Sequence, residues 1–247
     1  MEDYLIMALF WGLGGLVNGI AGFGAALIAT PLVTQFIDLS VAIPAGTIIG
    51  LSMSAQMGIT FRKFADWERL RPLIFGAFPG ALTGVTLMKK VPGDALKIAM
   101  GLFLMVYAFW GLFFEGRSQK VVSKYWGILA GFSSSAIGTS FGMGGPPTIV
   151  YTSLAGWRQE QVKAGIGSFF MIAAIIMISA QTLAGLQSVA SVTLAMVAVP
   201  SAVFGGWMGI RLSKCIGEFS YRKILFSLLM VMGLMILYRS AMALGFF

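Results

Sequence analysis

The sequence predicts an all-α integral membrane protein made of two inverted-topology repeats, each a broken helix or re-entrant hairpin followed by three transmembrane helices. Three observations predict this class: the composition, the distribution of basic residues and a duplication of short motifs. Of the 247 residues, 58% are hydrophobic and only 11% are charged. Soluble domains carry about 25% charged residues. Such a chain cannot build a polar surface, so its apolar stretches are expected to lie in lipid.

Charge-free stretches mark the expected membrane spans. A helix needs about 20 apolar residues to cross the hydrocarbon core. Two stretches, 4–37 and 125–157, are too long for one crossing and too short for two. The other stretches give six spans, at about 39–61, 72–90, 95–114, 162–183, 188–211 and 222–245.

Glycine-rich sequences interrupt the two long stretches. Residues 22–24 read Gly-Phe-Gly, and residues 142–147 read Gly-Met-Gly-Gly-Pro-Pro. Proline removes a backbone donor and clashes with the preceding turn, so the second stretch cannot be a continuous helix. Irregular backbone within a membrane must face protein or a water-filled cavity. We therefore expect a broken helix or re-entrant hairpin in each stretch.

The basic residues distinguish two possible topologies. If both long stretches cross the membrane once, the 17 basic residues divide almost evenly between the two sides. If both stretches return to their own side, one side keeps only four of the 17, namely Lys89, Lys90, Lys97 and Arg239. Cytoplasmic loops are enriched in Lys and Arg. This favours six full crossings of a bacterial cell membrane, with both termini outside.

Short motifs recur at a nearly constant offset. Gly-x-Gly begins at positions 22 and 142, Pro-x-Ala-x-x-Gly at 79 and 200, and Trp-Gly at 11 and 126. We interpret residues 1–116 and 117–247 as two repeats within one membrane domain. Because three full crossings is an odd number, the second repeat enters the membrane upside down. Inverted repeats of this kind are typical of secondary transporters, which work by alternating access to a site near the midplane.

The two breaks supply the candidate substrate site. A helix that starts inside the membrane presents unpaired N–H groups and the positive end of its dipole, and such ends bind anions. Glycine lets a ligand approach the backbone. The predicted substrate-binding residues are Gly22, Phe23, Gly24, Thr30, Gln56, Ser140, Gly142, Met143, Gly144 and Gly145.

Simpler roles exist for the same residues. Small residues pack helices closely, and Ser or Thr side chains bond to carbonyls of their own helix. Arg62 and Arg211 each close a predicted span. They would either attract an anion at the cytoplasmic mouth or only anchor the helix ends.

Other functional classes lack the residues that they require. With no histidine and one cysteine, the chain offers no zinc site, and a serine nucleophile would lack its usual base. No ionisable residue lies mid-span, where proton relays are found. We expect no enzyme activity, metal or cofactor. The expected partners are the lipid bilayer and a small anion, and not nucleic acid, because the basic residues form short loop clusters.

The glycine-rich motifs resemble those of the sulfite exporter TauE/SafE family of membrane permeases. In the first half, Gly15-x-x-x-Gly19-x-x-Gly22-Phe23-Gly24 followed by Thr30-Pro31-Leu32 is similar to the opening motif of that family. In the second half, Gly131-Phe132-Ser133 and the more specific Gly-x-Gly-Gly-Pro-Pro at 142–147 are similar to its repeat. The first motif departs in having Ala25-Ala26 where further glycines are common. The resemblance implies transport of small, mostly sulfur-containing anions such as sulfite, sulfonates or sulfoacetate.

Two alternatives stay open. A protein that flips or recycles a polyprenyl phosphate also uses re-entrant hairpins in inverted repeats, but normally needs buried Glu and Arg, which the apolar stretches lack. A scaffold subunit that transports nothing would bind no anion.

Overall fold

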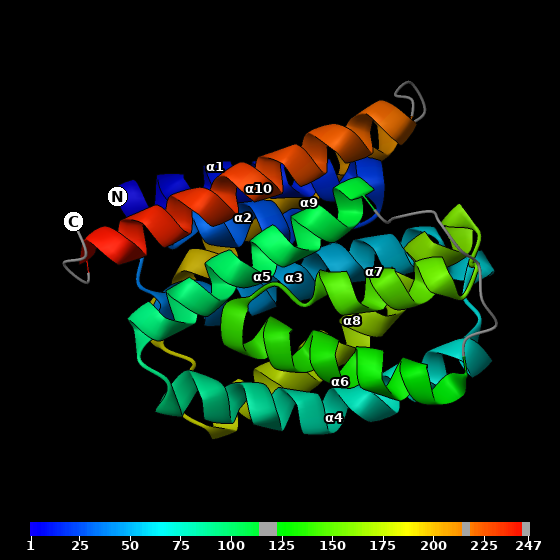
Figure 1. Ribbon diagram of the computed structural model, residues 1–247, viewed down its shortest axis with the longest axis horizontal. Helices are drawn as coiled ribbons and strands as arrows, with labels where there is room; N and C mark the ends of the chain where they lie inside the picture. The colour runs from blue at the N-terminus through cyan, green and yellow to red at the C-terminus, as the bar shows by residue number, and fades with distance from the viewer. Residues whose placement is uncertain (114–122, 214–217, 244–247) are drawn as a thin grey trace.

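The computed structural model describes residues 1–113, 123–213 and 218–243, and the regular secondary structure within them is helical (Figure 1). The predicted all-α membrane class is confirmed. Six of the described helices are long and apolar enough to cross a membrane. Arg117, Lys120 and Lys214, which entered the count of basic residues, and the repeat boundary at 116–117 lie outside the described residues.

Ten α-helices and one short 3-10 helix follow one another along the described chain. They are α1 (Glu2–Ala21), α2 (Ala25–Val33), α3 (Leu39–Thr60), η1 (Arg62–Phe64), α4 (Trp67–Lys90), α5 (Gly93–Phe113), α6 (Lys124–Phe141), α7 (Gly145–Leu154), α8 (Gln159–Leu183), α9 (Val189–Leu212) and α10 (Glu218–Ala243).

Helices α1 and α2 form the first long stretch and fold back against each other. Gly22 after α1 has a φ of 85°, and Gly24 before α2 has a φ of 101°. Both values lie in the left-handed region that glycine adopts without steric cost. Helix α2 then returns along α1, so that the rings of Phe36 and Phe10 stack with centroids 6.2 Å apart.

A re-entrant hairpin would turn about half-way across the membrane, but the first break follows a helix that is long enough to cross it. Helix α1 has 20 residues, which gives a length of about 30 Å, close to the thickness of the hydrocarbon core. It is one of the six candidate spans, together with α3, α4, α5, α8 and α9. In α10 the described apolar segment is Phe226–Ser240.

Helices α6 and α7 form the second long stretch and also fold back on each other. Gly142 ends α6 with a φ of 72°. Helix α7 begins with Gly145, Pro146 and Pro147. Proline is tolerated in this first turn because its missing N–H would have no partner within the helix. The Ser134 and Thr148 hydroxyls form a hydrogen bond between the two arms.

Glycines on one side of a helix allow each hairpin to pack closely against a helix from the other half of the chain. A Cβ atom on Gly15 of α1 would lie 2.2 Å from the Ala202 carbonyl oxygen of α9. A Cβ atom on Gly76 of α4 would lie 2.0 Å from the Ile128 carbonyl oxygen of α6. Small residues allow helix backbones to approach this closely in membranes. Helices α3 and α8, and helices α5 and α10, form the other main pairs.

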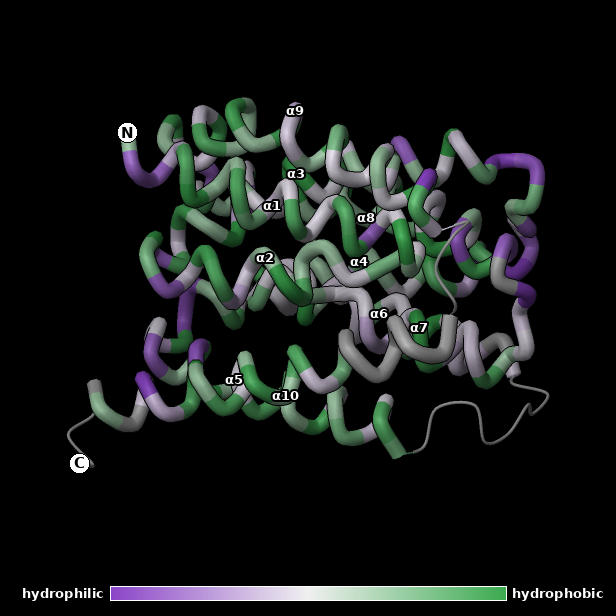
Figure 2. The backbone as a smooth tube through the Cα atoms, turned by 90° about the horizontal axis from the view of Figure 1, so that it is seen from above, coloured by the Kyte–Doolittle hydropathy of each residue, from purple (hydrophilic) through white to green (hydrophobic). Residues whose placement is uncertain are grey.

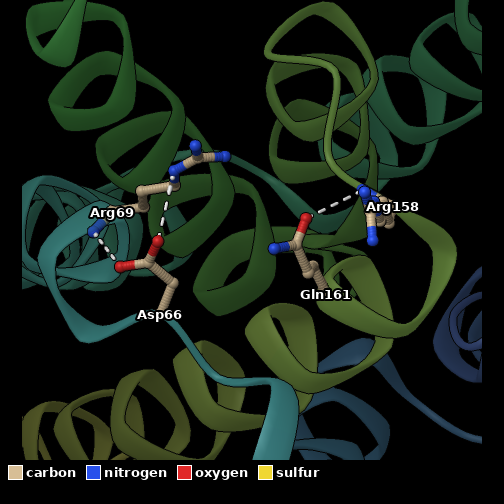
Figure 3. A network of polar contacts seen from close by, with 4 residues as sticks. All are labelled: Asp66, Arg69, Arg158 and Gln161. Carbon is tan, nitrogen blue, oxygen red and sulfur yellow. Dashed lines mark hydrogen bonds and ion pairs between the residues drawn. The ribbon is translucent and has the colours of Figure 1, made fainter.

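The chain termini and the hydrophilic stretches lie at the ends of the helix bundle. The start of α1 and the end of α10 lie at the same end (Figure 1). Hydrophilic stretches gather at the helix ends, while the helices between them are mostly hydrophobic (Figure 2). At the end of the bundle opposite the termini, local polar contacts stabilise the first turns of α4 and α8. Asp66 accepts from the Arg69 backbone N–H at 3.3 Å and pairs with its side chain at 3.2 Å, and Gln161 accepts from the Arg158 N–H at 3.0 Å (Figure 3).

The glycine contact between α1 and α9 gives a stability prediction. Replacing Gly15 by Ala places a methyl group 2.2 Å from a carbonyl oxygen, and overpacking of this kind costs about 1–3 kcal/mol. We expect Gly15→Ala to lower the thermal unfolding temperature of the purified protein in detergent. Gly93→Ala is the control, because its Cβ would have no neighbour within 4 Å. Equal melting of the two variants would contradict the role of this contact.

Candidate functional site

A cavity of about 110 Å³ lies where both helix breaks meet α3 and α8. Its lining comes from both halves of the chain. Seven of the ten predicted site residues line it: Gly22, Phe23, Gly24, Gly142, Met143, Gly144 and Gly145. The structure thus brings the two glycine-rich sequences, 120 positions apart in the chain, to a common space.

The first break presents an uncapped helix start to this cavity. Gly24 provides no side-chain cap for α2, and residues Gly24, Ala25, Ala26 and Leu27 all line the cavity. The N–H of Ile28 bonds to the Gly24 carbonyl at 3.2 Å and closes the first turn. The earlier N–H groups have no partner within the helix, as at every helix start. The positive end of the α2 dipole therefore points at the cavity.

The second break contributes close packing. Met143 is fully buried between the two hairpins. A Cβ on Gly144 would lie 2.4 Å from the Ser134 carbonyl oxygen, so only glycine fits there. Gly145 is less constrained, because its Cβ would come no nearer than 4.0 Å to the Ile149 side chain.

Three predicted site residues lie outside the lining and have partners in the protein. Thr30 donates its hydroxyl to the Gly142 carbonyl at 3.5 Å and so connects the two hairpins. Ser140 donates to the Ala136 carbonyl of its own helix at 2.7 Å. Gln56 donates to the Val203 carbonyl of α9 at 3.1 Å. Their use as substrate ligands stays a prediction.

Several lining side chains were not among the predicted site residues. Helices α1 and α3 add polar groups, and apolar and sulfur-containing side chains come from α1, α3 and α8. These additional residues are Trp11, Asn18, Thr47, Ser54, Met53, Met57, Ile166, Phe170, Ala174 and Met177. A cavity with a few polar groups on a largely apolar wall is the usual form of a small-molecule site.

Lys163 lies against the first break from α8. Its side chain is 9% exposed, and among the side chains that the structure describes it is the one charged group that is buried. Its Cγ would lie 2.6 Å from a Cβ on Gly22, and its ammonium group is 5.6 Å from the centroid of the Phe61 ring. In the sequence, Lys163 is one of the 17 basic residues and is expected to lie in a loop. Its stem is buried in the way that long cationic side chains allow.

A buried amide network connects the cavity wall to the α8–α9 turn. Gln181, which is fully buried, donates to the Thr47 hydroxyl at 3.2 Å and accepts from Gln187 at 3.1 Å. Gln187 also donates to the Pro44 carbonyl at 3.3 Å, and Ser191 donates to Gln187 at 3.0 Å. The network therefore ties α3 to α8 and α9 near the end that holds the termini.

This network predicts a measurable stabilisation. Replacing Gln181 by Leu removes its two hydrogen bonds, to Thr47 and from Gln187, which together cost about 1–3 kcal/mol. We expect Gln181→Leu to lower the unfolding temperature in detergent. The neighbouring variant Thr182→Val is the control, because Thr182 is exposed and bonds only to the Ile178 carbonyl of its own helix. A Gln181→Leu variant as stable as the control would show that the network is dispensable.

Apolar helices long enough to span a membrane surround a cavity with two facing helix breaks, an arrangement typical of multi-pass membrane transporters. Comparison with known sequences specifies the family. The profile of the sulfite exporter TauE/SafE family matches residues 7–236. The chain therefore belongs to the sulfite exporter TauE/SafE family.

Curated relatives include two membrane transport proteins. The probable membrane transporter protein YunE of Bacillus subtilis (strain 168) is 22% identical over 181 residues, which cover 69% of this chain and 63% of that protein. The L-lactate permease of Streptococcus iniae is 27% identical over 180 residues, which cover 70% of this chain and 31% of that protein. The chain thus spans less than two thirds of either relative. No solved structure matches.

Proposed function

We propose that the protein is a permease for small anions, with sulfite or a short sulfonate as the substrate, in a bacterial cell membrane. The observation that carries this proposal is the shared cavity: the uncapped start of α2 and the second break line the same space. Backbone N–H groups and a helix dipole favour a negative charge there. The family membership supports the sulfur-containing substrate.

The size of the cavity favours a very small solute. A cavity of about 150 Å³ accommodates benzene. By that measure 110 Å³ accommodates about four or five non-hydrogen atoms, enough for sulfite or methanesulfonate. Sulfoacetate would require the cavity to widen. A small carboxylate is the second candidate, favoured by the similarity to an L-lactate permease.

The helix pairing supports alternating access between two inverted repeats. If α1 to α5 correspond in order to α6 to α10, the α1–α9 contact corresponds to the α6–α4 contact. The α3–α8 and α5–α10 pairs each join corresponding helices. Such pairing is what a two-fold relation between the halves produces, and rocking of one half against the other would expose the cavity to each side in turn.

Basic residues support the orientation of the protein. Arg62, Lys63, Arg158 and Arg211 lie at helix ends remote from the termini. An excess of Lys and Arg marks the cytoplasmic side, so both termini would be outside. Lys163, at the same end, adds a positive charge beside the first break.

Filling the cavity tests the proposed site without disturbing the fold. Gly50 lines the cavity, and its Cβ would have no neighbour within 4 Å. We expect Gly50→Val to lower sulfite flux into proteoliposomes about tenfold, the equivalent of about 1.4 kcal/mol of lost substrate binding. L-lactate flux measured in parallel distinguishes the two substrate classes.

The control for this variant is Gly93→Val, because that position also has open space and lies away from the cavity. The unfolding temperature of both variants should stay near that of the wild type. Undiminished sulfite and lactate flux in Gly50→Val would rule out the cavity as the transport site. Substitution at Gly144 is less informative, because the clash with Ser134 would disturb folding as well.

Removing the charge of Lys163 tests its contribution to anion entry. We expect Lys163→Gln to raise the KM for sulfite about three- to tenfold with little change in maximal flux, because a nearby positive charge concentrates anions. Proteoliposome flux at several sulfite concentrations measures both quantities. The control is Lys90→Gln, an exposed residue at the other end of the bundle. An unchanged KM in Lys163→Gln would show that this lysine has only a packing role.

A further inference from the structure

A buried indole N–H without a partner belongs to a residue that lines the transport cavity. Trp11 on α1 is 1% exposed, and its Nε1 makes no hydrogen bond in the structure. Among the buried side-chain polar atoms without a partner in the described ranges, it is the one N–H group. An indole nitrogen can only donate, and a buried donor without an acceptor reduces stability. The position therefore calls for an acceptor that comes from outside the protein.

The indole of Trp11 lies at the cavity wall. Trp11 and Gly46 both line the cavity. The indole Cζ2, Cη2 and Cε2 atoms lie 2.8, 3.4 and 3.8 Å from where a Cβ on Gly46 would be. The edge that meets α3 is therefore the Cζ2–Cη2 side of the six-membered ring, and Nε1 is bonded to the neighbouring Cε2. Glycine at position 46 leaves the space that this edge occupies.

The N–H groups available to a ligand are concentrated on the first hairpin. Helix α2 begins at Ala25 with Ala26 and Leu27 in its first turn, and all three residues line the cavity. Helix α7 begins with Gly145 and two prolines, Pro146 and Pro147, which have no N–H. Both breaks begin with a glycine of positive φ, Gly22 and Gly142, but they differ in the number of donors that they offer.

We propose that Trp11 Nε1–H and the first-turn N–H groups of α2 together bind the oxygen atoms of the substrate, which is an oxyanion with a sulfonate-type or carboxylate head group. The second break then shapes the cavity around the rest of the solute. Trp11 is the specificity-determining residue: its fixed N–H donates to one substrate oxygen while the α2 N–H groups donate to the others, a set of positions that a single halide ion fills only in part. This inference rests on the proposed function and deepens it.

The test observes the indole N–H directly. The full chain is labelled with ¹⁵N-tryptophan, placed in nanodiscs and titrated with sodium methanesulfonate, with sodium chloride at the same ionic strength as a reference. The six tryptophans are assigned by single substitutions to Phe. We expect the Trp11 indole proton to move downfield and saturate with methanesulfonate but not with chloride.

Trp126 provides a matched control. It occupies the corresponding Trp-Gly motif of the second half and is 60% exposed, so its resonance should not move. We expect Trp11→Phe to weaken methanesulfonate binding at least tenfold in a thermal-shift titration, as the loss of a hydrogen bond to a charged group predicts. Trp126→Phe should bind like the wild type.

The outcomes separate the two proposals. If methanesulfonate stabilises the wild type but leaves the Trp11 resonance unmoved, this inference is wrong and the permease function stands. If the wild type neither binds nor transports any oxyanion, both are wrong. If Trp11→Phe does not fold, the wild-type titration still decides, because the Trp11 resonance is the one that remains after the other five are assigned.

Discussion

The close backbone contacts between α1 and α9 and between α4 and α6 determine where the two helix breaks lie. Lipid tails are as apolar as the side chains, so helices in a membrane associate through close packing rather than through hydrophobic burial. Gly15 against Ala202 and Gly76 against Ile128 give such packing, with no room for even one methyl group. Because each contact joins a hairpin arm to the opposite half of the chain, both breaks are drawn to one cavity.

The cavity is a consequence of the backbone chemistry of the breaks. Each break leaves N–H or C=O groups that no helix satisfies, and lipid cannot satisfy them. The protein itself supplies hydrogen-bond partners for some of these groups; for example, the Thr30 hydroxyl donates to the Gly142 carbonyl. At the start of α2 the N–H groups face a space large enough for a small solute. The glycine-rich breaks that interrupt the helices therefore also provide the free N–H groups that can bind an anion.

Sequence reasoning located the groups whose position depends on local chemistry. The glycines at 22 and 24 and the prolines at 146 and 147 interrupt helices in any context, and the break residues line the cavity because they belong to the backbone itself. For Thr30, Gln56 and Ser140 the outcome depends on which side of a helix faces the cavity, which packing decides. Lys163 and Trp11 were missed because their burial comes from partners far along the sequence, Gly22 and Gly46. The division into inverted repeats stays a prediction.

The pairing of α1 with α9 also sets the order in which the protein can assemble. A membrane chain is synthesised from its N-terminus, and segments fold in that order. Helix α1 is made before α9, but the face that carries Gly15 and Gly19 has its partner in Ala202, Gly206 and Gly209 of that later helix. Until α9 inserts, this glycine face can meet only lipid or other proteins. The packing that holds α1 in place is therefore completed only when α9 inserts, and a chain truncated before α9 would have both breaks but would lack this contact.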